Sequence, residues 1–225
     1  MSAVATLLDE PCSKRLLAEA GIAVPRGVVL DAGADIGVAL AGLRFPLAVK
    51  LLSVEVTHKS DVGGVRLGLR DAEEVTRACA AIRDSAAAHG YAAERFLIEE
   101  MAPPGQEVVI GGLRDPRFGP VVMLGLGGIF VEIFADTAFR VCPIEPRDAR
   151  SMIEELRSAP LLHGARGRQP VSEEGLIAAL LAIGGEDGLL LRHPIAELDI
   201  NPLIVSPAGA VAADCRILLA EPAHG

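Results

Sequence analysis

The segment from Val56 to Val65 contains residue types that could handle a phosphate group. His58 can accept a phosphoryl group, because a neutral imidazole is nucleophilic near pH 7, and the adjacent Lys59 is a cation. Gly63 and Gly64 follow, and residues without a side chain let a ligand approach the backbone closely. A glycine turn that carries such groups between two strands is suited to closing over a polyphosphate. The same segment could also be a polar hairpin tip that binds nothing.

A second candidate site lies in a predicted strand over residues 195–206, where polar and apolar side chains alternate. Glu197, Asp199 and Asn201 occupy odd positions. The even positions hold the apolar residues Leu198, Ile200, Pro202 and Ile204. Because successive strand side chains point to opposite faces, one face should present only carboxylate and amide groups. An ordinary hairpin with one solvated face has the same alternation, although such a face more often includes Lys, Thr or Arg.

Asp214 could join this polar face from the next strand. If residues 207–210 form a hairpin loop, Ser206 lies opposite Val211 and Leu203 lies opposite Asp214. Directly opposed residues share a face, so Asp214 should lie beside Asp199 and Asn201. These oxygen ligands suit Mg²⁺, which takes few protein oxygens and completes its octahedron with water and phosphate.

Three more positions could contribute to a nucleotide site. Lys50 ends an apolar strand and could be a phosphate ligand or an ordinary surface lysine. Glu107 could accept hydrogen bonds from ribose hydroxyls or simply face solvent. Glu99 and Glu100 are strand neighbours that point to opposite faces, so at most one of them serves a given site.

Composition narrows the class of protein. The chain has 225 residues, is 51% hydrophobic and has a mean hydropathy of +0.40, which is ample for a buried core in one α/β domain or two lobes. A net charge of -9 argues against nucleic acid as a partner, but not against nucleotides. Four scattered cysteines without a CxxC pair favour reduced thiols in a cytoplasmic protein. We expect no membrane span and no secretion signal, because neither pattern is present.

Turn signals and periodicity predict alternating elements. We expect helices over residues 9–21, 35–41, 71–90, 148–157 and 173–183. We expect strands over residues 27–30, 47–50, 65–69, 95–101, 107–113, 121–125, 127–132, 138–142, 195–206 and 210–217. This alternation indicates sheets covered by helices. Pro103, Pro104 and Gly105 mark a boundary between an N-terminal lobe (residues 1–102) and a C-terminal lobe (residues 103–225).

The sequence contains a series of short motifs in a fixed order. They are Ser13-Lys14 with Gly21-Ile22, Val49-Lys50, the block His58–Val65, Glu100-Met101 with Gly105 and Glu107, Asp115 with Phe118-Gly119-Pro120, Gly125–Ile129 with Val131-Glu132, Gly164 with Arg166-Gly167, and Glu197–Pro202 with Asp214. Taken in order, these motifs resemble the ATP-grasp domain of the NDP-forming acyl-CoA synthetases, and most closely the β subunit of ADP-forming acetate–CoA ligase, a relative of the succinyl-CoA synthetase β subunit. They extend over residues 9–218, and the blocks at His58 and at Asp199–Pro202 are distinctive in combination.

The resemblance implies an α+β (α/β) ATP-grasp fold with a nucleotide held between two lobes. It implies that Lys50 binds nucleotide phosphates under the flap of Lys59, Gly63 and Gly64. It also implies that the backbone of Glu100 and Met101 faces the adenine and that Glu107 contacts the ribose or the metal. Asn201 and Asp214, with Asp199 close by, would be the Mg²⁺ ligands. His58 would be a second phosphoryl carrier, and Arg166 would neutralise charge during transfer.

The resemblance also implies a reaction: acyl-CoA, ADP and phosphate interconvert with acid, CoA and ATP. In this family the acyl-CoA chemistry and the first phosphohistidine belong to an α subunit or region. We find no CoA-binding region in this sequence, so we expect a separate CoA-binding α subunit in a heterotetramer. The alternatives are a stand-alone ATP-grasp carboxylate ligase and a non-catalytic nucleotide-sensing module.

Overall fold

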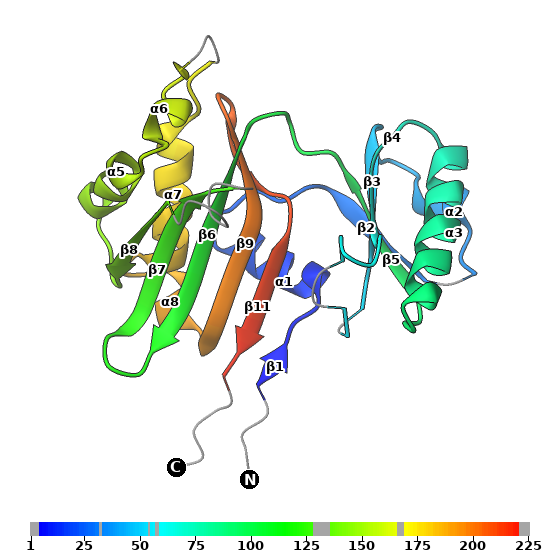
Figure 1. Cartoon of the computed structure of the whole chain (residues 1–225), viewed down its shortest axis with the longest axis horizontal. Coiled ribbons are helices and arrows are strands. Elements are labelled where there is room, and N and C mark those ends of the chain that lie inside the picture. Colours follow the sequence, from blue (N-terminus) through cyan, green and yellow to red (C-terminus); the bar gives the residue numbers. More distant parts are fainter. Residues whose placement is uncertain are drawn as a thin grey trace. The chain divides into compact units, whose positions relative to one another are not determined.

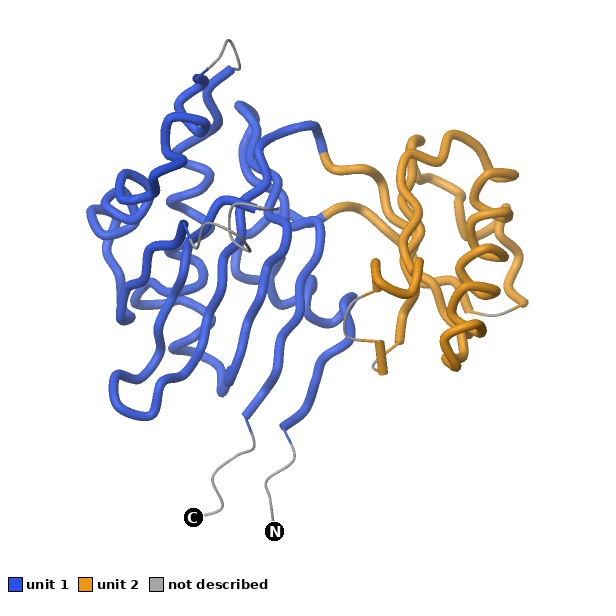
Figure 2. The backbone as a smooth tube through the Cα atoms, in the orientation of Figure 1, with its two compact units in different colours: residues 1–24, 103–225 blue, residues 25–102 orange. Residues whose placement is uncertain are grey.

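A computed structural model describes residues 5–31, 33–53, 55–56, 59–127, 136–165 and 169–220. The chain forms two compact units (Figure 2). Unit 1 combines Met1–Val24 with Pro103–Gly225, and unit 2 is Pro25–Ala102. The chain thus passes between units after Ala102, at the predicted boundary. Residues 1–24 differ from the predicted lobe 1–102, because their strand and helix pack in unit 1.

Unit 2 is a four-stranded antiparallel sheet covered by helices. Its elements are β2 (Gly27–Asp31), α2 (Ile36–Ala39), β3 (Leu47–Leu51), β4 (Val65–Leu69), α3 (Ala72–Ala88) and β5 (Arg95–Glu100), with the strand order β2-β5-β3-β4. Val75, Cys79 and Ile82 of α3 are buried in one core with Val49 and Ile98 of the sheet. The apolar stripe of α3 therefore covers one face of β3 and β5.

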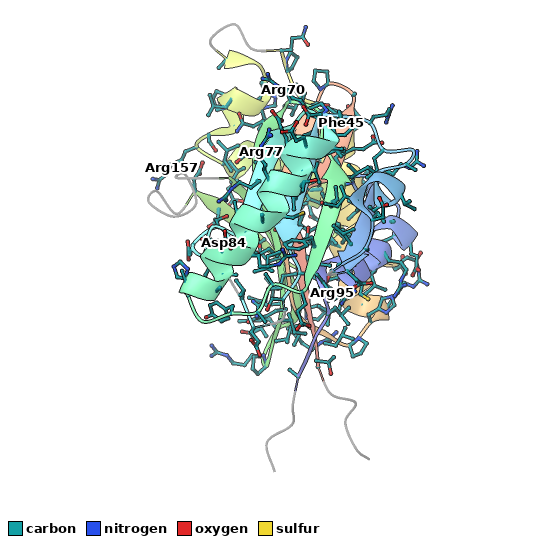
Figure 3. All side chains as sticks on the ribbon, turned by 90° about the vertical axis from the view of Figure 1, so that its right-hand side faces the viewer. Phe45, Arg70, Arg77, Asp84, Arg95 and Arg157 are labelled. Atoms are coloured by element: carbon teal, nitrogen blue, oxygen red, sulfur yellow. The ribbon has the colours of Figure 1, made fainter. Side chains whose placement is uncertain are left out.

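The sequence explains where α3 begins and ends. The Asp71 carboxylate accepts a hydrogen bond from the Glu74 N–H at 2.8 Å, which satisfies a free donor of the first turn. The helix ends before Gly90, whose φ of 82° suits a residue without a side chain. Arg77 and Asp84 lie on its exposed side (Figure 3). In the described part of the chain, none of the helices has the length and apolar character needed to cross a bilayer.

Unit 1 is built on a seven-stranded antiparallel sheet. Its strands are β1 (Thr6–Leu7), β6 (Gln106–Asp115), β7 (Gly119–Leu126), β8 (Thr137–Val141), β9 (Ile195–Ser206), β10 (Gly209–Ala212) and β11 (Cys215–Leu219). The order is β1-β11-β9-β6-β7-β8, and β10 pairs with β9. Pairing of β1 with β11 explains why the first residues of the chain belong to this unit.

Helices cover one face of this sheet (Figure 1). They are α1 (Glu10–Glu19), α5 (Pro146–Glu155), α6 (Ala159–Leu162), α7 (Glu173–Gly184) and α8 (Leu189–Arg192). Side chains of β6, β7, β9 and β11 that point to the helices, such as Ile110, Leu124 and Ile200, are fully buried in one core. The sequence predicted three of these helices, whereas β1, α6 and α8 are too short to give a periodic signal.

The hairpin after β9 differs from the predicted one. Ser206 pairs with Gly209 and Leu203 with Ala212, so the turn has two residues and not four. The Ser206 hydroxyl accepts from the Ala208 N–H at 3.2 Å, and Gly209 adopts a φ of 133°, which together allow the tight turn. The slip amounts to two residues, and an even slip by itself does not exchange the two faces of the hairpin.

The alternation along β9 also shifts. Leu198 and Ile200 are buried as predicted, but Leu203 and Val205 are then buried in place of Pro202 and Ile204. The cause is an extra residue on β9: Ile110 pairs with Ile200 and Val108 with Leu203. Such a bulge reverses the alternation beyond it, and proline, which has no N–H to donate, is tolerated there.

Candidate functional site

The face of the unit 1 sheet that points away from the helices, here called the open face, carries four of the predicted site residues. Strand register places Asp199 opposite Gly111 of β6 and opposite Arg216 of β11. Glu107 lies on the same face of β6, because it is separated from Gly111 by an even number of residues. Asn201 and Asp214 complete the group.

Asn201 and Asp214 are direct neighbours across adjacent chain segments. The Asn201 N–H donates to the Asp214 carbonyl at 3.2 Å, and the Ala213 N–H donates to the Pro202 carbonyl at 2.9 Å. The side chain of Asn201 is exposed and that of Asp214 is half-buried, with Oδ1 accepting from the Cys215 N–H at 2.8 Å. The backbone thus makes Asn201 and Asp214 neighbours, and the Cys215 N–H holds the Asp214 carboxylate.

The donor set has the chemistry that Mg²⁺ prefers. Asn201 and Asp214 offer amide and carboxylate oxygens, and Asp199 follows two residues from Asn201 on the same strand face. Among the described residues, no group of three or more His, Cys, Asp or Glu side chains could hold a metal ion. Two carboxylates and an amide fit a hydrated cation that also binds phosphate, and not a closed structural metal site.

Glu107 is exposed on β6, where it pairs with Ile204. The Gly127 N–H donates to its carbonyl at 2.9 Å, and a Cβ at Gly127 would lie 2.9 Å from the Glu107 Cβ. A larger residue at 127 would therefore push the Glu107 side chain away from its position. This close approach explains the first glycine of the pair at positions 127 and 128.

In unit 2, Lys50 is paired and not solvent-facing. Its Nζ lies 3.0 Å from Glu99 Oε2, and both side chains are more than 90% buried. Lys50 and Glu99 both point away from the core that α3 covers, since Val49 and Ile98 fill that core. Gly27 lies opposite Glu99, and a Cβ there would come within 2.6 Å of the Glu99 Cγ, so the glycine makes room for this carboxylate.

The predicted glycine flap is a compact turn. The Gly64 N–H donates to the Lys59 carbonyl at 2.6 Å, and the Ser85 hydroxyl of α3 donates to the Val62 carbonyl at 2.8 Å. Gly63 has a φ of 64°, and a Cβ there would lie 2.7 Å from Ser85 Oγ. A Cβ on Gly64 would lie 2.8 Å from the Lys59 carbonyl oxygen. Packing of the chain against itself is thus sufficient to require both glycines.

The predicted hinge at Glu100 and Met101 uses its backbone donors internally. The Glu100 N–H donates to the Arg26 carbonyl at 2.8 Å and the Met101 N–H to the Pro46 carbonyl at 3.1 Å. The Glu100 side chain binds Arg44 through Nε and Nη2, at 3.1 and 2.8 Å. The hydrogen bond from Arg44 lowers the pKa of Glu100. A hinge contact to a base would therefore use carbonyl oxygens of this segment.

His58 and Arg166, the two predicted catalytic residues, lie outside the described residues. The structure also places two side chains that the sequence reading did not assign. Glu99 is the ion-pair partner of Lys50, and Arg216 lies opposite Asp199 on the open face. The signal for Arg216 was the alternation along β11, where Arg216 is a polar residue between the buried Cys215 and Ile217.

Comparison with known proteins identifies the family. A family model described as ATP-grasp domain matches residues 1–219. The β subunit of ADP-forming acetate–CoA ligase I from Pyrococcus furiosus is 41% identical over 216 residues, which cover 94% of this chain and 91% of that one. ADP-forming acetate–CoA ligase I from Archaeoglobus fulgidus is 35% identical over 182 residues, which cover 80% of this chain but 26% of the much longer relative.

Solved structures of related proteins support the same family assignment. The dinucleotide-forming acetyl-coenzyme A synthetase 1 of Candidatus Korarchaeum cryptofilum, in complex with coenzyme A and Ca-AMPCP, matches with a TM-score of 0.86 and 41% identity over 95% of this chain and 93% of that one. Another structure of that enzyme, with Mg-AMPPCP and a phosphohistidine segment pointing towards the nucleotide-binding site, has a TM-score of 0.79 and 41% identity over 95% of this chain and 92% of that one. The ATP-grasp fold is thereby confirmed. This chain belongs to the ATP-grasp family, among the β subunits of ADP-forming acetate–CoA ligases.

Proposed function

We propose that this chain is the nucleotide-binding subunit of an ADP-forming acyl-CoA synthetase that works with a separate CoA-binding α subunit in a heterotetramer. The overall reaction converts acyl-CoA, ADP and phosphate into acid, CoA and ATP. The observation that carries the proposal is the backbone-linked pair of Asn201 and Asp214 beside Asp199, in a chain that belongs to this family. No acyl-CoA site is needed in such a subunit.

Within unit 1, Asn201 and Asp214, with Asp199, would hold Mg²⁺, and Glu107 would contact the ribose or the metal. A bound Mg²⁺ would supply neutralisation of the phosphate charge. In unit 2, the Lys50 ammonium would bind nucleotide phosphates, and Glu99 keeps this ammonium at a fixed position. The turn of Lys59, Gly63 and Gly64 would lie over the phosphates.

The chemistry assigned to this subunit is phosphoryl transfer between histidine and ADP. The N–P bond of a phosphohistidine breaks, its electron pair stays on the ring nitrogen, and a terminal oxygen of ADP forms the new P–O bond. In a relay, His58 first takes the phosphoryl group through a new N–P bond and then passes it to ADP in the same way. Arg166 would neutralise charge during transfer. Such transfer depends mainly on positioning and charge stabilisation.

The test combines this chain with its CoA-binding partner and measures ATP formed from acyl-CoA, ADP and phosphate. We expect Asn201→Ala and Asp214→Ala each to lower kcat/KM by at least about 100-fold, as expected for loss of a metal ligand. Asp187→Ala is the matched control, because Asp187 is an exposed carboxylate of the same unit on the turn before α8. We expect it to retain normal activity. Normal activity of Asp214→Ala would refute the proposed metal pair.

A second arm follows the phosphoryl group itself. Incubation with γ-labelled ATP should label this chain, and His58→Ala should remove the label while His163→Ala retains it. Label that persists in His58→Ala contradicts the relay. Turnover of ATP by the isolated chain with an acid and an amine or thiol would show a stand-alone ligase instead. ATP binding with neither labelling nor ATP synthesis would show a sensing module.

A further inference from the structure

The hairpin of β9 and β10 connects the candidate metal residues to both places where the chain passes between its two units. Asn201 precedes the paired part of this hairpin and Asp214 follows it, so the two candidate ligands lie at its base. Two hydrogen bonds close the base, from the Asn201 N–H to the Asp214 carbonyl at 3.2 Å and from the Ala213 N–H to the Pro202 carbonyl at 2.9 Å. A ligand held by both side chains would therefore also bridge the base of the hairpin.

The first crossing segment is attached to β10. The chain leaves unit 1 after Val24. One residue earlier, the Ala23 carbonyl accepts from the Ala212 N–H at 2.8 Å, and Ala23 forms a parallel bridge with Val211. Ala212 is fully buried, so water does not compete for this hydrogen bond. The second strand of the hairpin thus holds the chain at the point where it leaves unit 1.

The second crossing segment is attached to β9. The chain returns to unit 1 at Pro103, and Gln106 at the start of β6 pairs with Val205. Gly105 approaches the same residue so closely that a Cβ would lie 2.4 Å from the Val205 carbonyl oxygen. Close approach of two backbone segments therefore requires glycine at position 105. Both crossing segments are thus attached to the hairpin that has the candidate metal ligands at its base.

The two ends of this hairpin differ in how they are supported. At the tip, the Ser172 N–H at the start of α7 donates to the Ser206 carbonyl at 2.9 Å. At the base, Asn201 and Pro202 form the β9 bulge and oppose Val109 alone. A bulge interrupts the hydrogen-bond ladder, so the base is the less regular end. An additional link at the base would therefore act where the ladder is interrupted.

We propose that cation binding by Asn201 and Asp214 is coupled to fixation of the two crossing segments through the β9–β10 hairpin, with Gly105 as a positioning residue for the metal pair. This inference rests on the proposed function, which assigns Mg²⁺ to this pair. Joint ligation by both side chains adds a link across the base and makes opening of the hairpin less favourable. Because Ala23 and Gly105 contact the same hairpin, the crossing segments are held more firmly with it. The coupling is reciprocal, so loosening a crossing segment weakens cation binding.

Amide hydrogen exchange of the full chain, followed by NMR with and without Mg²⁺ alone, tests the coupling in one direction. At an Mg²⁺ concentration about ten times the dissociation constant, exchange of the Ala212 and Gln106 amides should slow about tenfold, because opening then requires release of the cation. The Cys142 amide, which donates to the Pro120 carbonyl at 2.8 Å, is the control and should not change. Slowing at the base alone would overturn the coupling. Equal slowing at Cys142 would overturn it in favour of a general stabilisation.

Gly105→Ala tests the opposite direction without changing a candidate ligand. The added Cβ must displace the Val205 carbonyl, so we expect Mg²⁺ to bind about tenfold more weakly in calorimetric titrations. In the ATP-synthesis assay, the Mg²⁺ concentration for half-maximal rate should rise by the same factor, while kcat at saturating Mg²⁺ stays within about twofold. Gly119→Ala is the matched control, because Gly119 has a φ of 79° and no atom within 4 Å of a built Cβ. Its Mg²⁺ affinity should equal that of the wild type.

The outcomes separate the coupling from the proposed function. Loss of Mg²⁺ binding in Asp214→Ala, together with wild-type affinity in Gly105→Ala, would overturn the coupling and leave the metal pair intact. Unchanged Mg²⁺ binding in both Asp214→Ala and Asn201→Ala would refute the metal pair and the coupling with it. If Gly105→Ala does not fold, the exchange measurement on the wild-type chain decides alone.

Discussion

Two neighbouring glutamates in β5 show how burial decides what an ion pair contributes. Glu99 pairs with Lys50 at 3.0 Å, and both side chains are more than 90% buried. Glu100 pairs with Arg44 at 2.8 Å, but the Arg44 side chain is 85% exposed. Breaking a buried pair leaves an uncompensated charge in a medium of low dielectric constant, whereas water screens an exposed pair. The same residue type therefore has different roles at adjacent positions.

This contrast gives a prediction with an internal control. Glu99→Gln should lower the free energy of unfolding by about 3 kcal/mol, because the buried ion pair between Lys50 and Glu99 is broken. Glu100→Gln should lower it much less, because water screens the exposed pair of Glu100 and Arg44. Urea denaturation of the two variants at neutral pH measures both. Equal effects would mean that Lys50 reaches solvent and is not held by Glu99.

At the scale of elements, the turn before β4 depends on α3. The Ser85 hydroxyl holds the Val62 carbonyl, and Gly63 approaches the same hydroxyl so closely that a Cβ would lie 2.7 Å away. Arg66 Nη1 adds a hydrogen bond of 2.8 Å to the Gly63 carbonyl. The segment that we propose to cover the nucleotide phosphates is thus attached to α3, which has 17 residues.

Alanine substitution tests this attachment. Gly63→Ala should be destabilising by the cost of a positive φ, about 1–2 kcal/mol, plus the clash with Ser85. Gly68→Ala is the matched control, because Gly68 has a φ of 75° but no atom within 4 Å of a built Cβ. Gly63→Ala should be more destabilising than Gly68→Ala, and this excess destabilisation should shrink when Ser85→Ala is added. A double-mutant cycle measured by thermal unfolding gives both quantities. An unchanged excess would show that Ser85 does not confine the turn.

The bulge in β9 is a second feature at this scale. The two residues Asn201 and Pro202 oppose Val109 alone, so the strand buries Ile200 before the bulge and Leu203 after it. Without the extra residue, the strand would keep one alternation throughout, and either Asn201 or the core beyond it would lie on the wrong face. The bulge thus lets one long strand present Asp199 and Asn201 outward and still fill the core at Leu203.

At the scale of the whole molecule, the described residues form two separate hydrophobic cores. Cys79 belongs to the smaller core in unit 2, whereas Cys142 and Cys215 belong to the larger core in unit 1. Burial raises the pKa of all three thiols, that of Cys142 to about 11. Since the thiolate is the reactive form, these cysteines should be protected in the folded protein, and Cys12 at the start of α1 is only half-buried.

Thiol labelling should therefore report the two cores separately. At pH 8 in buffer we expect Cys12 to react first, and the fast phase should disappear in Cys12→Ser. With increasing urea, Cys79 should react at a lower concentration than Cys142 and Cys215, because a smaller core buries less apolar surface. Mass spectrometry of the labelled peptides identifies each site. Simultaneous exposure of all three buried thiols would show instead that the two cores unfold as one cooperative unit.

Local signals in the sequence were sufficient for the elements that carry their own periodicity and caps. Asp71 and Gly90 marked the ends of α3, and the apolar run ending in Lys50 gave β3, because these signals act over a few residues. The spacing of two residues between Asp199 and Asn201 placed both on one strand face for the same reason. The ordered motifs also identified the ATP-grasp family, which the comparisons confirm.

Other features depend on residues that are far apart in the chain. The sequence could not show that residues 1–24 join unit 1, because this follows from the pairing of β1 with β11. It could not pair Lys50 with Glu99 or Asp199 with Arg216, since those neighbours arise from strand register. Sequence by itself thus determined the family, most elements and the kinds of side chain in the candidate site. Only the tertiary structure decided which of them meet, because register, bulges and burial are settled by packing between distant segments.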